Sequence, residues 1–453
     1  MKTQPCTSGF RQSLSGWGMA PVEECLTFQP EREADIPRIL AASPPTIVPR
    51  GAGMSYGDAS LNPEGVLILE RCARFMAFNH DTGLLTCEAG VTLKEVLAFA
   101  VPHGWFLPVI PGTKNATIGG AFACNVHGKN NFCKGEFAEH VRSVLIRLAD
   151  GTRVECSQQS DKDLFWASAG GLGMTGIVEA VTIQLMQIAS AQLAVSTQRV
   201  ATLSAMIEAF EANRSSAEYM IGWMDHTAKG AALGRGVFES AVHVKAEDKT
   251  LGAYKPATEK ISVPFSAPSW LLNRYSMALY NHLRFSKVPQ NPSTHVAAFD
   301  GFFHPLDGIG HWNRLYGKRG FLQYQCIIPE NAKTTSNIRS VLERIQQAGL
   351  FSFLAVIKYH RAHKGVFSFS LPGYSLALDF PNTPAVLTLL DQLDEVVAEM
   401  GGRVYLAKDA RMKRPVFERM YHDELKAWKP LVKRLDPGHK WQSSLSRRLG
   451  LKE

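Results

Sequence analysis

Three glycine-rich segments, separated by strand-like sequence, most strongly limit how this chain can fold. They read PRGAGMSYGDAS (residues 49–60), PGTKNATIGGAFACNVHGKN (residues 111–130) and GGLGMTGIV (residues 170–178), and are called the first, second and third glycine segments. Glycine permits close backbone approach, so successive N–H groups can converge on phosphate oxygens. Three such segments in one region indicate a large phosphate-bearing cofactor rather than three ordinary turns.

The third segment matches the dinucleotide fingerprint G-x-G-x-x-G, but its surroundings do not fit a Rossmann site. That fingerprint needs a helix after it and an acidic residue about 20 positions later. Here the β-branched sequence from Ile177 onward is typical of a strand, and Glu179 follows too closely. The sequence also lacks a G-x-x-x-x-G-K-[ST] loop, which removes the usual signature of ATP-driven chemistry.

The hydrophobic pattern predicts an α+β protein of two main domains. In the first, we expect strands at 66–69, 84–89, 144–148, 153–156 and 177–185, a helix at 92–103, and a type I′ hairpin turn at Asp150-Gly151. In the second, we expect helices at 203–213, 335–347 and 384–400, and strands at 321–328, 351–359, 375–380 and 403–407. In the helix at 384–400 the apolar positions are Val386, Leu387, Leu390, Leu393, Val397 and Met400.

We place the domains at 1–190, 191–402 and 403–453, the last being a C-terminal return to the first domain. Residues 247–292 mix charges and prolines with a short helix near 270–283, and we expect a mobile segment there. At 453 residues, 45% hydrophobic and 20% charged, the chain is too ordinary in composition to be wholly disordered or fibrous.

The excess charge is concentrated at the C-terminus. The net charge is +8, and residues 403–453 hold 14 Lys or Arg against six Asp or Glu, which accounts for all of it. A solvated basic helix explains such a cluster in general, whereas the sharper interpretation is contact with phosphate or anionic lipid. Nucleic acid is not needed as an explanation. We expect contact with a membrane surface through Arg411, Lys413 and Arg414, or through Arg447 and Arg448.

The eight cysteines form no C-x-x-C pair, so we expect free thiols. We found no signal-peptide-like apolar stretch and no run of 18 apolar residues, which favours a cytoplasmic protein, peripheral on the inner face of the membrane if it contacts one. His360 and His363 are spaced like metal ligands, but without a carboxylate partner nearby we expect no metal.

Together, the three glycine segments resemble the FAD-binding (PCMH-type) half of the vanillyl-alcohol oxidase type flavoprotein superfamily. The resemblance implies FAD as cofactor, with a second α+β domain built on an antiparallel sheet. The residues that it assigns to the cofactor are Arg50, Gly51, Ala52, Gly53, Met54, Ser55, Tyr56, Gly57, Asp58, Ala59, Ser60, Gly112, Thr117, Ile118, Gly119, Gly120, Cys124, Asn125, Val126, His127, Ile177 and Tyr405.

One departure from the superfamily concerns how FAD is held. Many relatives carry a histidine, covalently linked to the flavin, where this chain has Met54. A thioether cannot form that bond, so we expect non-covalent FAD.

Motifs in the rest of the chain resemble the oxidases of lipid-linked ribose phosphates within that superfamily. These motifs are FHPLDGIGHWNRLYGKRGFLQYQ, FLAVIKYH, LPGYSLALDFP, GGRVYLAKDAR and SSLSRRLGL. The resemblance implies oxidation of the 2-hydroxyl of a polyprenylphosphoryl-β-D-ribose to the 2-keto sugar, the first half of an epimerisation to arabinose. It also implies a short-chain dehydrogenase as the keto-sugar reductase partner. The electron acceptor stays open between oxygen, a quinone and a soluble carrier.

Lys408 in YLAKDAR is the expected catalytic base. Residue type alone favours a surface ion pair with Asp409, but the motif resemblance reverses that preference. A lysine base must be partly neutral near pH 7, so we expect it to be desolvated or close to another cation such as Lys358. In a second version Lys408 stays protonated and stabilises the reduced flavin, while His127 or water takes the proton.

A sugar pocket needs hydrogen-bonding side chains, and Gln323 and Gln325 at period two would face one side of a strand. Core packing is the alternative for Trp223, Tyr316 and Tyr405. Relatives carry a reactive cysteine where this chain has Ala377, so catalysis should not require that thiol. The expected substrate residues are Tyr56, Trp223, Tyr316, Gln323, Gln325, Lys358, Ala377 and Lys408.

Two other functions stay open. The same FAD domain serves many alcohols, so an oxidase of a soluble alditol or aldonolactone is the first alternative. The second is a non-catalytic flavin-binding partner protein.

Overall fold

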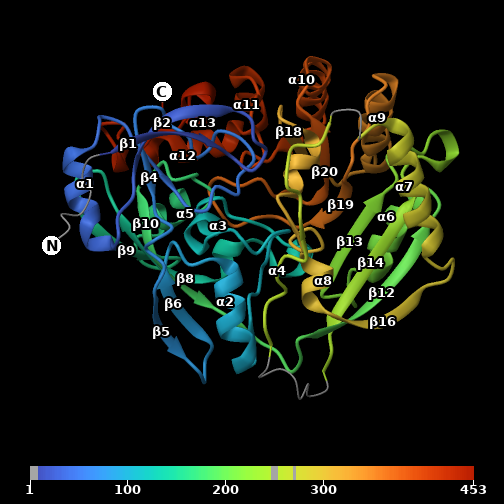
Figure 1. The fold of residues 1–453 in the computed structure, drawn as a ribbon, viewed down its shortest axis with the longest axis horizontal. Helices are drawn as coiled ribbons and strands as arrows, with labels where there is room; N and C mark the ends of the chain where they lie inside the picture. Colours follow the sequence, from blue (N-terminus) through green and yellow to red (C-terminus); the bar gives the residue numbers. More distant parts are fainter. Residues whose placement is uncertain (1–8, 246–253, 269–271, 453) are drawn as a thin grey trace.

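The computed structural model describes residues 9–245, 254–268 and 272–452, and folds them into two halves that lie side by side (Figure 1). The first half holds two sheets with strand orders β1-β2-β4-β3 and β5-β6-β10-β8-β9. Their strands are β1 (Phe10–Ser15), β2 (Val22–Phe28), β3 (Val48–Arg50), β4 (Val66–Ile68), β5 (Phe75–Asn79), β6 (Leu84–Glu88), β8 (Val141–Arg147), β9 (Arg153–Ser157) and β10 (Ile177–Gln184). Its helices are α1 (Ile36–Ala42), α2 (Leu93–Ala100), α3 (Ile118–Ala123), α4 (Asn131–Lys134) and α5 (Lys162–Ser168).

The second half is an eight-stranded antiparallel sheet in the order β16-β12-β14-β13-β19-β20-β18-β21. Its strands are β12 (Gln192–Val200), β13 (Tyr219–Met224), β14 (Gly236–His243), β16 (Ser293–Ala298), β18 (Phe321–Pro329), β19 (Ala355–His360), β20 (Gly373–Pro381) and β21 (Arg403–Val404). Helices α6 (Leu203–Asn213), α9 (Thr334–Gln347) and α10 (Pro384–Glu399) pack on one face of it. The expected α+β class, with an antiparallel sheet in the second half, is confirmed.

Two further helices, α7 (Arg274–Lys287) and α8 (Phe299–Phe303), belong to the second half. Short strand pairs are formed by β7 (Trp105–Phe106) with β11 (Met186–Gln187), and by β15 (Ile261–Ser262) with β17 (Ile309–Gly310). Helices α11 (Arg414–Met420), α12 (His422–Leu435) and α13 (Ser444–Leu449) return to the first half, where a β-bridge joins Trp441 to Ile47 (Figure 1).

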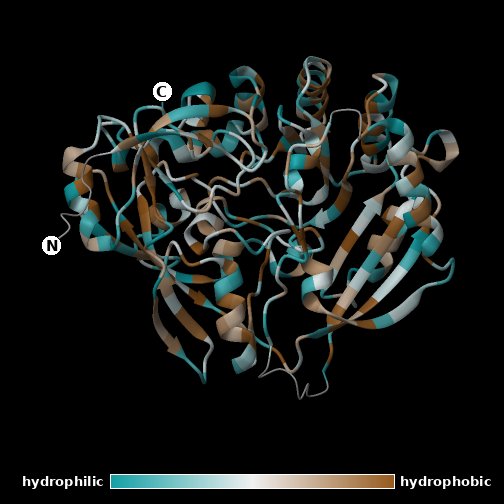
Figure 2. Ribbon diagram, in the orientation of Figure 1, coloured by the Kyte–Doolittle hydropathy of each residue, from teal (hydrophilic) through white to brown (hydrophobic). Residues whose placement is uncertain are grey.

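The helices begin where the sequence supplies caps. The Thr92 hydroxyl accepts from Glu95 N and the Glu95 side chain reaches back, which forms a capping box at α2. Thr383 caps α10 directly before a proline in the first turn, a position where the missing N–H costs little. Helices α9 and α10 are amphipathic, and Figure 2 shows hydrophobic and hydrophilic residues alternating along both of them.

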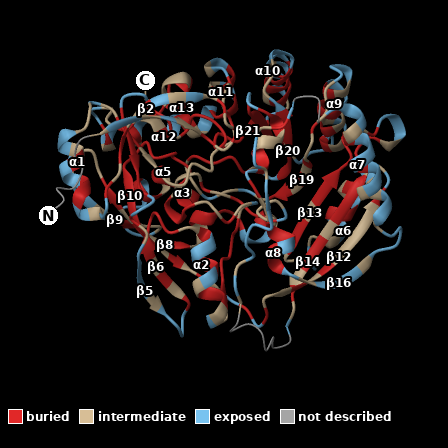
Figure 3. Ribbon diagram, viewed as in Figure 1, coloured by how far each residue is buried: buried red, intermediate tan, exposed pale blue. Residues whose placement is uncertain are grey.

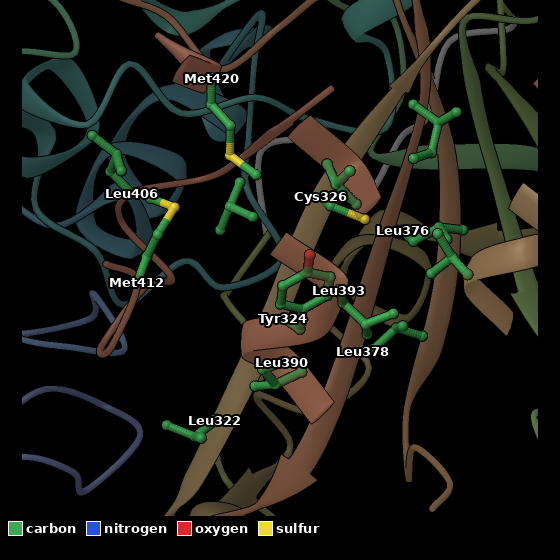
Figure 4. Close-up of a cluster of buried hydrophobic side chains, with 14 of the residues drawn as sticks. Leu322, Tyr324, Cys326, Leu376, Leu378, Leu390, Leu393, Leu406, Met412 and Met420 are labelled. Atoms are coloured by element: carbon green, nitrogen blue, oxygen red, sulfur yellow. The ribbon is translucent and has the colours of Figure 1, made fainter. Parts of the chain in front are cut away.

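The core of the second half lies between the sheet, α10 and the C-terminal segment. Figure 4 shows β18 and β20 directing alternate side chains toward α10, as the period of two predicts. The labelled members, all buried, are Leu322, Tyr324, Cys326, Leu376, Leu378, Leu390, Leu393, Leu406, Met412 and Met420. The prediction that Leu387 belongs to the apolar face of α10 is wrong: Leu387 is 36% exposed, and Leu389 is buried instead.

Other local expectations need correction. The strand expected at 403–407 ends at Val404, and the strand expected at 351–359 begins only at Ala355. The helix expected at 270–283 is α7, while 247–253 and 269–271 of the segment expected to be mobile lie outside the described residues. The hairpin between β8 and β9 is present, but its turn is not type I′: only Gly151 has a positive φ (88°), and Gly151 N donates to Leu148 O as in a three-residue loop.

The basic C-terminal segment is largely paired within the fold. Arg448 forms ion pairs with Asp58 (2.7 Å) and Asp409 (2.9 Å), and Arg411 pairs with Asp394 (2.6 Å). Ion pairs also join Arg411 and Lys413 to Asp391, Arg414 to Glu418 and Arg447 to Glu64. All five side chains expected at an anionic surface have carboxylate partners, but Lys413, Arg414 and Arg447 stay 68%, 39% and 34% exposed. The expected surface contact therefore stays a prediction.

Candidate active site

A cavity of about 610 Å³ lies between the two halves and is lined by all three glycine segments and one face of the eight-stranded sheet. Its size is that of a typical cofactor or ligand site. The face of the sheet that lines it is opposite to the one covered by α10. Both halves are therefore needed to enclose it.

The first and second glycine segments pack closely together and both line the cavity, which suits a long phosphate-bearing cofactor. A Cβ on Gly51 would lie 2.2 Å from Thr117 Oγ1, so a side chain there would force the segments apart. Arg50 orders the first segment by donating to Ser60 Oγ (3.0 Å) and Ser15 O (2.7 Å). In addition, the buried His127 Nδ1 has no protein partner among the described residues, so this ring atom can meet a bound ligand.

Most of the residues expected at the cofactor and the substrate line this cavity. They are Arg50, Gly51, Ala52, Gly53, Met54, Ser55, Tyr56, Ala59, Ser60, Gly112, Thr117, Gly119, Gly120, Cys124, Val126, His127, Trp223, Gln323, Gln325, Lys358, Ala377, Tyr405 and Lys408. Gln323 and Gln325 both line the cavity, so their side chains lie on the same face of β18, as the period of two predicts.

Six expected contacts lie outside the lining of the cavity: Gly57, Asp58, Ile118, Asn125, Ile177 and Tyr316. Asp58 is buried against Arg448, and Asn125 donates to Glu136 Oε2 (2.6 Å). Ile118 and Ile177 are core side chains, and Gly57 lies against the backbone of Asp409. Tyr316 stacks on Phe321, with ring centroids 4.3 Å apart, behind the cavity. The side chains of these six residues therefore pack around the lining of the cavity, and their contact with a ligand stays a prediction.

Strand register explains how the second half presents its side chains. Trp223 pairs with Val356 on β19, Val356 with Ala377 on β20, and Ala377 with Gln325 on β18, so the four form one row across the sheet. Two residues along β20 and β18, Asp379 pairs with Gln323 in a second row. Ala377 occupies the middle of the first row, where a longer side chain would protrude into the cavity.

Lys408 lies in the turn after β21, with its Nζ 3.7 Å from the centre of the Tyr56 ring. Burial lowers the pKa of Lys408 to about 7, with the nearby Lys358 acting in the same direction and Asp379 opposing. The alternative of a surface ion pair with Asp409 is wrong, because that carboxylate binds Arg448 and accepts from Arg411 N and Met412 N. Lys408 is therefore a partly neutral amine facing the cavity, as a general base requires.

Asp379 is a site residue that the sequence analysis missed. Gln323 Nε2 donates to Asp379 Oδ1 (2.5 Å) and also lies 3.3 Å from the Tyr56 hydroxyl. The Tyr316 hydroxyl is 3.5 Å from Asp379 Oδ2, and burial raises the pKa of Asp379 to about 7. The residue stands in the quoted motif LPGYSLALDFP, two positions after Ala377, so strand alternation could have singled it out.

His127 lies at the opposite side of this polar group. Its Nε2 is 2.7 Å from Gln325 Nε2, from which it accepts, so the ring proton belongs on Nδ1. Burial, followed by repulsion from His360 and Lys358, holds the pKa of His127 well below its ordinary value. Because its lone pair is occupied and its pKa is low, His127 is a weaker base than Lys408. His360 itself contacts Ser370 and Ser375.

The cavity continues past Lys358 to a second group of charges that the sequence did not suggest. Arg284 from α7 lies over the Trp223 ring, with Cζ 4.6 Å from its centre. Burial lowers the pKa of Lys129 to about 7, with Glu239 opposing and Lys358 and Arg284 adding to the effect. Lys129 stands in the second glycine segment and could have been found there, whereas Arg284 and Glu239 have no local signal.

Comparisons with known proteins match this chain to FAD-binding oxidases. A family model described as an FAD binding domain matches residues 26–157. The chain is 33% identical over 452 residues to the decaprenylphosphoryl-beta-D-ribose oxidase of Mycolicibacterium smegmatis, which covers 97% of both chains. It is 32% identical over 375 residues to an uncharacterized protein in the mprA 5′ region of Streptomyces coelicolor, covering 80% of this chain and 100% of that one. To the L-gulonolactone oxidase of Mus musculus it is 24% identical over 222 residues, which is 48% of this chain and 49% of that enzyme.

The chain is thus an FAD-dependent oxidoreductase, and the expected cofactor is confirmed. Within that class, the similarity to the M. smegmatis oxidase extends over nearly the whole length of both chains. The chain belongs to the decaprenylphosphoryl-β-D-ribose oxidase family.

Replacing Lys408 with Ala should lower the rate of flavin reduction by roughly 10²- to 10⁴-fold, the usual contribution of a positioned acid or base. In the wild type this rate should rise as the pH increases through about 7, because Lys408 must lose its proton before it can accept one. Asp379→Asn is the matched variant: removing a charge that raises the pKa of Lys408 should move the midpoint down by about one pH unit. Stopped-flow flavin absorbance measures both. A rate unchanged in Lys408→Ala would contradict the assignment.

Precipitating the holoprotein with acid should release all of the FAD into the supernatant, because Met54 offers no atom that can form the histidyl bond. Absorbance near 450 nm in the supernatant and a colourless pellet check this, with a covalent flavoprotein treated in parallel as control. Yellow colour remaining on the pellet would show a covalent link elsewhere in the chain.

Proposed function

We propose that this protein oxidises the 2-hydroxyl of a polyprenylphosphoryl-β-D-ribose to the 2-keto sugar. The observation that supports this best is the cavity itself, which places a partly neutral lysine beside a row of amide and carboxylate groups and then continues to Arg284 and Lys129. The named relative from M. smegmatis acts on the same kind of sugar by its printed name.

The polar rows suit a ribofuranose. Gln323, Gln325 and Asp379 offer donors and acceptors from one face of the sheet, and Lys358 adds a cation beside them. Because the Tyr56 ring and Ala377 enclose the same space with apolar surface, the sugar is oriented by a few polar contacts in a mainly dry site.

The proton and the hydride leave in different directions. Bound FAD supplies the acceptor for the hydride from the carbinol carbon. Neutral Lys408 accepts the hydroxyl proton at Nζ and becomes an ammonium, while Asp379 nearby stabilises that positive charge. The alcohol thus loses one hydride and one proton, which balances its conversion to a ketone.

The substrate phosphate fits the far group of charges. Arg284 and Lys129 both line the cavity beyond Lys358, and phosphate oxygens favour such paired cations. The prenyl chain then leaves past α7. A soluble alditol or aldonolactone would use the same polar rows but would bring no phosphate to Arg284 and Lys129, so it uses less of the cavity.

The pathway and location follow from this substrate. A keto-sugar reductase of the short-chain dehydrogenase class would consume the product, and a quinone is a suitable electron acceptor beside oxygen or a soluble carrier. A lipid-linked substrate also implies peripheral contact with the inner face of the cytoplasmic membrane. In the part of the chain that the structure describes, none of the helices is long and apolar enough to span a bilayer.

Anaerobic addition of polyprenylphosphoryl-β-D-ribose should bleach the flavin, while free alditols and aldonolactones should leave it oxidised at the same concentration. Absorbance near 450 nm reports the result. Bleaching by the soluble sugars alone would replace the proposed substrate with the alternative one. Stoichiometric FAD that none of these compounds reduces would support a non-catalytic flavin protein.

Arg284→Ala should raise KM for a short-chain, water-soluble phosphoryl riboside by about tenfold or more, the usual effect of losing a charge-assisted hydrogen bond, with little change in kcat. The matched control is Arg274→Ala on the same helix, since Arg274 does not line the cavity. A non-phosphorylated riboside should respond equally to both variants. A lower kcat with unchanged KM in Arg284→Ala would contradict a role in binding phosphate.

A further inference from the structure

Helix α7 contacts the substrate cavity with one face. Met277 and Asn281 are buried, and Asn281 Nδ2 donates to Asp225 Oδ1 (2.9 Å). Tyr280 and Arg284 line the cavity itself. The inner face of α7 is therefore fixed to the sheet at the end of the cavity assigned to the phosphate.

The outer face of α7 carries apolar side chains that the protein leaves in solvent. Tyr275, Leu279 and Leu283 recur every four residues, so they form one stripe along the helix. Their exposed fractions are 76%, 61% and 50%, and Figure 3 shows α7 largely in the colour for exposed residues. An exposed apolar stripe of this kind marks a surface for a partner or a membrane.

Exposed apolar side chains are concentrated in the stretch of sequence that contains α7. Within the described ranges, seven of the twelve large hydrophobic residues that are exposed fall between residues 261 and 296. Besides the stripe they are Ile261, Phe265, Tyr280 and Val296. Scattered exposure would be ordinary, but this concentration in one stretch of chain is not.

The charges of α7 favour one occupant. The helix RYSMALYNHLRFSK contains Arg274, Arg284 and Lys287 and no acidic residue. Basic residues beside an apolar stripe are the pattern of a helix that lies in the interface of an anionic membrane. A second copy of the same chain would instead bring the like-charged helices together.

We propose that the stripe of Tyr275, Leu279 and Leu283, flanked by Arg274 and Lys287, docks on an anionic lipid bilayer. This inference rests on the proposed function and deepens it, because the same helix then joins the bilayer to the cavity. A lipid-linked sugar enters past Tyr280 while its prenyl chain stays in the membrane. The substrate phosphate arrives at Arg284 without crossing open solvent.

The test uses the full-length holoprotein and vesicles of phosphatidylglycerol or phosphatidylcholine in a sedimentation assay. The triple variant Tyr275→Ser, Leu279→Ser, Leu283→Ser should bind phosphatidylglycerol vesicles at least about tenfold more weakly than the wild type, since each side chain loses its burial in lipid. Binding to phosphatidylcholine should be weak in both. The matched control replaces three exposed apolar side chains elsewhere, Phe10, Val22 and Met76, with Ser and should bind like the wild type.

Turnover separates this inference from the proposed function. The triple variant should match the wild type on a short-chain, water-soluble substrate and lose activity only on long-chain substrate in vesicles. Equal loss of vesicle binding in the control, no wild-type binding to phosphatidylglycerol, or a dimer that the triple variant converts to a monomer would overturn the docking surface. Vesicle binding without turnover of either substrate would overturn the proposed substrate while supporting the docking surface.

Discussion

The short segment at residues 403–409 joins the two halves of the protein, and the active site depends on it. β21 adds to the sheet as the neighbour of β18, and Tyr405 N donates to Gln325 O (2.8 Å). Two residues later Ala407 O accepts from Tyr56 N (2.9 Å) in the first glycine segment. Lys408 follows directly. The backbone beside it is therefore held by hydrogen bonds to the eight-stranded sheet on one side and to the first glycine segment on the other.

Buried ion pairs hold that segment in place. Arg448 bridges Asp58 of the first glycine segment and Asp409, which follows Lys408. Removing one partner of such a group would leave a buried charge unpaired, a cost of about 3–5 kcal/mol. Such pairs limit what the net charge of the C-terminus can indicate, because several of its cations already have carboxylate partners in the fold. The proposed membrane docking instead rests on the cations of α7 and its apolar stripe, which composition does not reveal.

Local patterns predicted what depends on neighbours in sequence. Helix α6 occupies the expected residues 203–213. The glycine segments predicted a large phosphate-bearing cofactor, and their resemblance to a flavoprotein superfamily implied FAD. Lys408 was found by its motif alone, since residue type argued for the surface. Asp379, Arg284 and Glu239 were missed because their place in the site depends on strand register and helix packing between residues far apart in sequence. Asn125 and Tyr316 show the same dependence: both stand in motifs of the site, but neither lines the cavity.

On the proposed function, the arrangement of charges along the cavity also explains how one site can hold an anionic substrate and keep a neutral base. A phosphate close to Lys408 would raise the pKa of its amine and hold the proton that must leave before catalysis. Lys408 is influenced by Lys358 and Asp379, whereas Lys129 is influenced by Lys358, Arg284 and Glu239. Lys358 therefore helps to lower the pKa of both lysines. On the proposed function, the phosphate is neutralised by Arg284 and Lys129 near α7, and the low pKa of Lys408 is preserved where the sugar reacts.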